Sequence, residues 1–177
     1  METEVNWTKY YENAYYCTLE TKLRSFQIKL FLKCIVFNNT LHGFGLVDSD
    51  KCAFCKTDTE DIMHFFYYCP YVKLFWDEVR DWITVITRVS RATIGIRECF
   101  LGIIEDKFCP FINCVLLVAR FFIYRCKFMN MKPSFDVFFN FLKEIKNSER
   151  RIAYKNGDIH KHRKNGNLYR DFPISLI

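Results

Sequence analysis

Four residues with metal-binding side chains lie close together in the sequence, in the order Cys52, Cys55, His64 and Cys69. They stand in an otherwise apolar and aromatic stretch, and their spacing is Cys-x2-Cys-x8-His-x4-Cys. Thiolate and imidazole groups are the usual ligands of a structural zinc ion, which takes four of them in a tetrahedron. The pattern therefore predicts a zinc site with no open coordination position, so that the ion is structural rather than catalytic. The alternative is four ordinary core residues, because the chain holds nine cysteines.

The segments around these residues predict how the four ligands would meet. A Cys-x2-Cys turn directs two thiolates to one point. Thr57 and Glu60 fit a capping box, which predicts a short helix over residues 58–68. Pro70 disfavours the α conformation in the residue before it, so we expect Cys69 to leave that helix and turn back towards the ion.

Helical periodicity flanks this stretch on both sides. Apolar residues recur at three- and four-residue steps in four segments: residues 19–37, 72–86, 111–122 and 138–145. The first segment is apolar on two sides, which is typical of a helix at the centre of a bundle. Pro70 and Pro110 suit the first turns of the second and third helices, and Ser134 is the expected N-cap of the fourth.

These signals predict a mainly α protein. The expected architecture is a small helical bundle with one zinc-knuckle-like insertion of the Cys-Cys-His-Cys type at residues 50–70. We assign residues 1–148 to the helical zinc-binding domain and residues 149–177 to a basic, partly flexible tail. The 19 phenylalanines also predict some apolar surface that a neighbouring protein would cover.

Composition indicates the compartment. The first residues, METEVNWTKYY, are acidic and polar and do not resemble a secretory signal. Nine cysteines without such a signal favour a reducing environment. No segment reaches the roughly 18 uninterrupted apolar residues that a membrane span needs. We therefore expect an intracellular protein, in the nucleus or the cytoplasm, that is neither secreted nor embedded in a membrane.

The net charge of +6 is concentrated near the C-terminal end. Residues 143–164 hold eight basic and three acidic side chains, whereas residues 1–142 hold 17 basic and 16 acidic ones. A localised basic segment suggests a polyanionic partner, most often RNA or DNA. The alternative is a solvated and partly frayed helix end. The candidate phosphate contacts are Arg150, Arg151, Lys155, Lys161, Arg163 and Lys164.

Residues 21–79 resemble the zinc-binding region that follows the polymerase in non-LTR (LINE-type) retrotransposon proteins. The resemblance depends on the stretches "KLRSFQIKL", "CAFC", "EDIMHFFYYC" and "FWDEV", and it continues more loosely through "LLVARFFIYRCK", "KPSF" and "ERRIAYKN". It implies that the zinc ligands are Cys52, Cys55, His64 and Cys69. It also implies an accessory domain that holds element RNA or target DNA near a reverse transcriptase.

The predicted function is therefore nucleic-acid binding by an accessory domain that is not itself an enzyme. The chain lacks the Tyr/Phe-x-Asp-Asp carboxylate pair with which polymerases bind two metal ions. Two alternatives stay open. One is a protein-interaction module that packs on the polymerase and does not contact nucleic acid. The other, which we favour least, is a nuclease remnant around "KPSFD", with Asp136 as its carboxylate.

Overall fold

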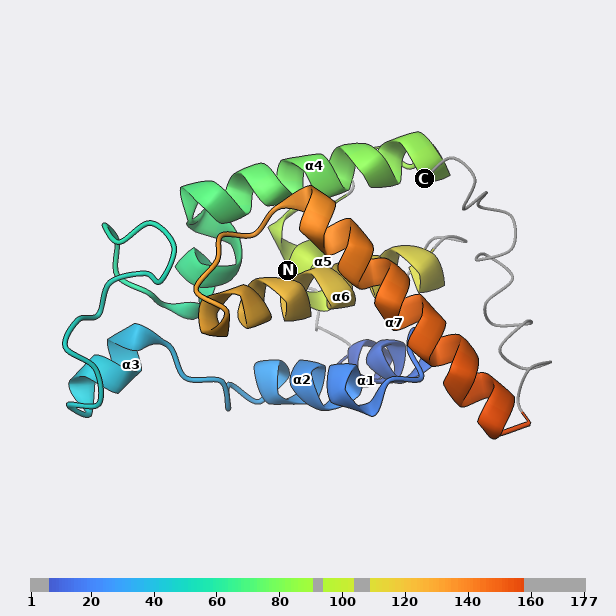
Figure 1. Ribbon diagram of the computed structural model, residues 1–177, viewed down its shortest axis with the longest axis horizontal. Helices are drawn as coiled ribbons and strands as arrows, with labels where there is room; N and C mark the ends of the chain where they lie inside the picture. The colour runs from blue at the N-terminus through green and yellow to red at the C-terminus, as the bar shows by residue number, and fades with distance from the viewer. Residues whose placement is uncertain (1–6, 91–93, 104–108, 158–177) are drawn as a thin grey trace, which may run out of the picture.

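The computed structural model describes residues 7–90, 94–103 and 109–157, and this part of the chain is largely helical (Figure 1). Within it no strand is assigned, and an isolated antiparallel bridge joins Lys51 to Thr59. The predicted mainly α class is confirmed. The elements are α1 (Trp7–Tyr16), α2 (Thr21–Phe31), α3 (Asn38–Gly43), the π-helical turn η1 (His64–Tyr68), α4 (Pro70–Thr87), α5 (Ile96–Leu101), α6 (Cys109–Phe128) and α7 (Phe135–Lys155).

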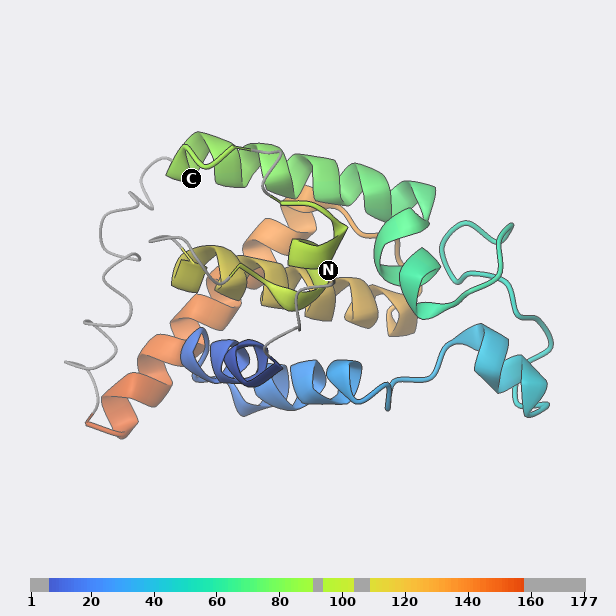
Figure 2. The ribbon, with the colours of Figure 1, turned by 180° about the vertical axis from the view of Figure 1, so that it is seen from behind.

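Helix α6 occupies the centre of the bundle. Every residue from 111 to 120 is buried, and the helix packs against α1, α2, α5, α7 and η1. Figure 1 shows α6 between α4 and the α1–α2 pair, with α7 crossing in front, and Figure 2 shows α5 on the opposite side. The loop between α3 and η1, which carries the cysteine turn, projects at one end of the bundle (Figure 1).

The expectation that residues 19–37 form the central helix is wrong. Helix α2 ends at Phe31, Lys33 adopts a left-handed conformation with φ 55°, and residues 38–43 form the separate helix α3. Ile28 of α2 and Leu32, directly after it, are exposed, so this helix is not buried on two sides. The longer and more uniformly apolar α6 takes the central position instead.

The other predicted helices are present. Helix α4 buries Val72, Phe75 and Val79 on the predicted face. Helix α7 begins directly after Ser134, although the Ser134 side chain forms no capping hydrogen bond. Helix α1 has no counterpart among the predicted helices. None of the helices in the described ranges is both long and apolar enough to cross a membrane.

Helix α7 extends past the boundary that we expected between residues 148 and 149. It continues to Lys155, so the first part of the predicted tail is helical. Residues 158–177 lie outside the described residues, and the division into a domain and a tail stays a prediction. A hydrogen bond from the Thr18 hydroxyl to the Glu149 carboxylate fastens α7 to the α1–α2 corner.

A buried polar contact fastens α2 and α5 to the central helix. Arg120 of α6 donates to Gln27 Oε1 through Nε and Nη2, at 3.1 and 2.7 Å, and to the carbonyl oxygen of Cys99 through Nη1. Burial lowers the pKa of the Arg120 guanidinium to about 10. These hydrogen bonds satisfy a cation that sits among apolar side chains.

Candidate metal centre

The four predicted ligands converge on one point. One donor atom from each of Cys52, Cys55, His64 and Cys69 lies within 4.8 Å of the other three. The sulfur atoms of Cys52 and Cys69 are 3.8 Å apart, and Cys55 Sγ is 3.3 Å from His64 Nε2. A tetrahedral zinc ion with Zn–S bonds of ~2.3 Å separates two sulfur ligands by about 3.8 Å. Three cysteines and one histidine at this spacing fit a closed structural zinc site.

The first two cysteines lie on a tight turn. The bridge between Lys51 and Thr59 closes the base of the turn. Inside it, the backbone N–H of Lys56 donates to the carbonyl oxygen of Cys52 at 3.0 Å. The backbone N–H of Phe54 lies 3.4 Å from Cys52 Sγ, where it can donate to a thiolate. The backbone therefore both forms the turn and stabilises negative charge on its first sulfur.

The second pair of ligands is brought together by the wide turn η1. The backbone N–H of Cys69 donates to the carbonyl oxygen of His64 at 2.8 Å, a bond that spans five residues and defines a π-helical turn. Cys69 then has φ −55° and ψ 129°, which is an extended conformation. The predicted effect of Pro70 is thus confirmed, since Cys69 leaves the helical conformation directly before the proline.

The capping box expected between Thr57 and Glu60 is wrong. The Glu60 side chain is fully buried and does not cap the helix that we predicted over residues 58–68. Its carboxylate accepts hydrogen bonds from the backbone N–H groups of Asn38, at 3.0 Å, and Ala53, at 2.7 Å, and forms an ion pair with Lys127. The helical turn that holds His64 accordingly begins later than residue 58. No local pattern could have revealed this contact, because Lys127 lies 67 positions further along the chain.

Hydrogen bonds and burial shift the pKa values of the three cysteine thiols in different directions. A hydrogen bond to Cys69, assisted by burial, raises the pKa of the Cys52 thiol, and the same hydrogen bond lowers the pKa of Cys69. Burial alone would raise the pKa of Cys55, but hydrogen bonds from Asp58, Thr57 and His64 outweigh it and lower that pKa. Zinc binding displaces the thiol protons, so the affinity for the ion falls in acid.

An aromatic cluster connects the site to the core. Phe54 lies between the first two cysteines and stacks on Phe65, with ring centroids 5.1 Å apart and an interplanar angle of 22°. Phe65 in turn packs against Phe37 and Phe66. Phe54 is only 5% exposed, so its ring packs under the metal turn and is not available to stack on a nucleobase.

The predicted phosphate contacts lie elsewhere. Arg150, Arg151 and Lys155 are exposed near the end of α7. Asp136 is exposed in the first turn of that helix. In the described ranges, the cysteine–histidine cluster is the one group of three or more Cys, His, Asp and Glu side chains that is placed to share an ion. The remaining predicted contacts, Lys161, Arg163 and Lys164, lie outside the described residues.

Comparison with known proteins agrees with this site. Residues 1–76 match the family model described as zinc-binding in reverse transcriptase. Neither the curated proteins nor the solved structures give a match. The matched residues include all four converging side chains, and together the match and the cluster support a structural zinc ion. Residues 1–76, which hold all four candidate ligands, are therefore similar to the zinc-binding domain of reverse transcriptases.

Proposed function

We propose that this protein is a zinc-stabilised accessory domain that binds nucleic acid for a reverse transcriptase. The observation that carries the proposal is the convergence of four donor atoms within 4.8 Å, inside the matched residues. In this proposal Cys52, Cys55, His64 and Cys69 are the zinc ligands. The ion would cross-link the cysteine turn to η1 and to the start of α4, so that its binding free energy becomes folding free energy.

The proposed nucleic-acid contact is the basic end of α7 together with the residues that follow it. Arg150, Arg151 and Lys155 are exposed, and their segment carries nearly all of the excess positive charge. Clustered arginine and lysine side chains neutralise phosphates and release counterions, which makes binding sensitive to salt. The proposal extends this contact to Lys161, Arg163 and Lys164.

A direct test is a fluorescence-anisotropy titration with labelled RNA and single-stranded DNA of the same sequence. We expect binding at about 50 mM salt that weakens steeply by about 200 mM, with a linear dependence of log K on log salt. Absence of binding at the lower salt concentration, or a slope near zero, would contradict the proposal.

A second candidate function is a protein-interaction module, and the exposed apolar surface of α1 and α2 favours it. Ile28 of α2 and Leu32, directly after α2, are exposed, and Trp7 of α1 is 50% exposed beside Phe31, with their ring centroids 6.2 Å apart. The partner in this case would be the polymerase part of a parent reverse transcriptase. Loss of polymerase association in Leu32→Glu, without any oligonucleotide binding by the wild type, would favour this second function.

The proposal includes an intracellular location and no catalytic activity. The matched family is described by its zinc binding, and Asp136 is not part of a cluster that could hold a metal ion among the described residues. Incubation of plasmid DNA with Mg²⁺ or Mn²⁺ tests this part. Cleavage that disappears in Asp136→Ala would show a nuclease instead.

A further inference from the structure

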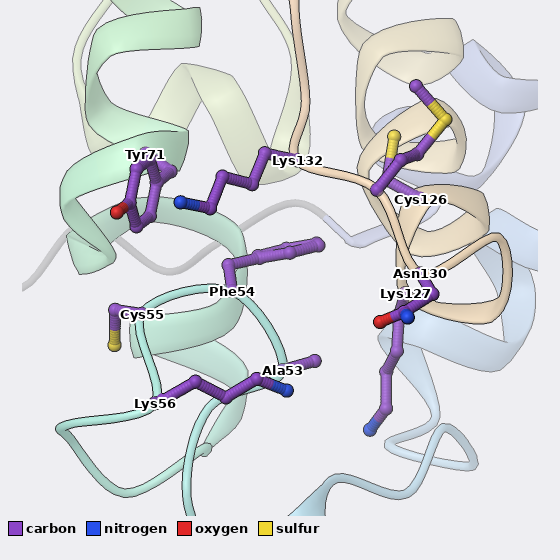
Figure 3. Close-up of a pocket in the computed structure, with 10 residues that line it drawn as sticks. Ala53, Phe54, Cys55, Lys56, Tyr71, Cys126, Lys127, Asn130 and Lys132 are labelled. Carbon is purple, nitrogen blue, oxygen red and sulfur yellow. The ribbon is translucent and has the colours of Figure 1, made fainter.

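A hollow of about 290 Å³ lies beside the candidate metal centre, between the cysteine turn and the segment that joins α6 to α7 (Figure 3). We propose that this hollow holds one nucleotide of a single-stranded nucleic acid. Its phosphate would lie against Lys56 and Lys132, and its base against Tyr71. The inference rests on the proposed nucleic-acid function and adds a second contact, away from the basic end of α7.

Three segments that are distant in sequence form the walls. Phe54 and Lys56 come from the cysteine turn, Tyr71 comes from the first turn of α4, and Asn130 and Lys132 come from the α6–α7 connection. Figure 3 shows the Lys132 side chain extending towards the ring of Tyr71, with Phe54 beneath it. The hollow therefore forms only when the zinc-binding segment and the bundle are both in place.

A cation and an aromatic ring meet on one wall. Lys132 Nζ lies 3.6 Å from the centroid of the Tyr71 ring, and Lys132 is exposed whereas Tyr71 is half-buried. Proteins that bind single strands combine these same two elements: positive charge for the backbone and aromatic rings on which bases stack. Lys132 covers one face of the Tyr71 ring, so we expect its ammonium to move onto the phosphate when a base stacks on that face.

Two of the three lysines at the hollow are available for a phosphate. Lys127 also lines it, but its ammonium forms an ion pair with the buried Glu60. Among the described residues, neither Lys56 nor Lys132 forms an ion pair with a carboxylate. The hollow consequently presents two positive charges without a carboxylate partner, Lys132 against the Tyr71 ring and Lys56 on the cysteine turn.

The backbone conformation at Lys56 determines which substitution tests its charge. Lys56 has φ 61°, in the left-handed region that glycine adopts without strain and a lysine does not. Asn130, across the hollow, has φ 50°, although asparagine tolerates this region better. Glycine is therefore an unstrained replacement for Lys56, and Lys56→Gly removes the charge without a backbone penalty.

A different role for these lysines would be to offset charge at the metal centre. Three thiolates exceed the charge of Zn²⁺ by one unit, and Cys55 itself lines the hollow. This role predicts that removal of Lys56 or Lys132 weakens zinc binding and leaves oligonucleotide binding unchanged. The two roles can therefore be separated by experiment.

The test measures binding of about 12-nucleotide oligo-U and oligo-dT by the zinc-loaded full chain, using fluorescence anisotropy. We expect Lys56→Gly, Lys132→Ala and Tyr71→Leu each to weaken binding about fivefold to tenfold, and Tyr71→Phe to retain it. Lys29→Ala, which removes an exposed charge from α2 outside the hollow, is the matched control and should bind like the wild type. The melting temperature of Lys56→Gly should not fall, because glycine relieves the left-handed backbone.

Cross-linking gives an independent measurement. An oligonucleotide with 5-iodouridine, irradiated in the complex, should form a covalent adduct with Tyr71 that mass spectrometry locates. If the wild type binds but the three hollow variants bind equally well, or the adducts fall only on α7, the hollow inference is wrong and the proposed function stands. If the wild type binds no oligonucleotide, the proposed function fails and the hollow inference fails with it.

Discussion

Glu60, fully buried in the loop before η1, forms an ion pair with Lys127 near the end of α6. The same carboxylate accepts hydrogen bonds from the backbone of Ala53 in the cysteine turn and of Asn38 at the start of α3. Lys127 Nζ also donates to Asn38 Oδ1 at 2.8 Å. One carboxylate thus holds together the metal centre, α3 and the central helix.

This ion pair predicts that removal of the Lys127 charge strongly destabilises the fold. Lys127→Met leaves the Glu60 carboxylate buried without a counter-charge, and we expect it to lower the free energy of unfolding by about 3 to 5 kcal/mol. Urea denaturation of the zinc-loaded protein measures the effect. The double variant Glu60→Gln/Lys127→Met should recover part of the loss. A double variant no more stable than Lys127→Met would show that the buried charge is not the cause.

The zinc ligands should be distinguishable from the other cysteines by their effect on stability. Cys52→Ser and His64→Ala should abolish zinc binding and lower the free energy of unfolding by at least about 4 kcal/mol, the contribution of a ligand present at 1,000 times its Kd. The control is Cys34→Ser, because Cys34 is exposed and lies outside the cluster. Thermal unfolding in the presence and absence of a chelator measures the difference. Equal stability of all three variants would contradict the ligand assignment.

The basic end of α7 should determine the salt dependence of nucleic-acid binding. The triple variant Arg150→Ala/Arg151→Ala/Lys155→Ala should weaken binding and reduce the slope of log K against log salt by about 0.7 for each phosphate contact that is lost. Anisotropy titrations across a salt series measure the slope. The matched control replaces three exposed lysines on other helices: Lys22, Lys29 and Lys73. An equal change of slope in both triple variants would show that only net charge matters.

Glu149 should make the stability of the fold depend on pH. Burial raises the pKa of its carboxyl group, against the opposing effect of hydrogen bonds from the Thr18 hydroxyl and the Leu19 N–H. The folded protein therefore holds this proton more tightly than the unfolded chain does. The resulting stability is fully present below the unfolded pKa of ~4.3 and is lost as the pH rises through the higher, folded pKa.

Glu149→Gln removes this titration and keeps an oxygen that can accept both hydrogen bonds. Relative to the wild type, the variant should therefore gain stability as the pH rises from about 4 towards neutrality. Urea denaturation of both proteins at several pH values measures the difference between their free energies of unfolding. Loss of zinc in acid affects both proteins equally and cancels in this difference. A difference that stays constant with pH would contradict the raised pKa.

The sequence alone predicted those features of the structure that a short-range pattern determines. The cysteine turn and the departure of Cys69 from the helix follow from residue spacing and from Pro70, and both are present. The helices α4 and α7 also follow from apolar periodicity, since their buried faces lie where the periodicity places them, and α6 is present but buried on all sides over residues 111–120. In each case the determining residues are within a few positions of one another.

The features that sequence reasoning missed depend on contacts between distant segments. Residues 19–37 have the periodicity of a central helix, but the bundle places the more apolar α6 there. Glu60 matches a capping box locally, yet its ion pair with Lys127 decides its position. The π-helical turn at His64 was also missed, because sequence patterns predict helical faces and not the insertion of an extra residue in one turn.

The most direct test of the account is the metal content of the protein purified without added metal, measured by elemental analysis alongside circular dichroism. We expect one zinc ion for each chain, none in Cys52→Ser, and loss of the native helical signal or of its cooperative unfolding when a strong chelator removes the ion. A wild-type protein that contains no zinc and still unfolds cooperatively at an unchanged temperature would contradict the central claim that zinc holds this fold together.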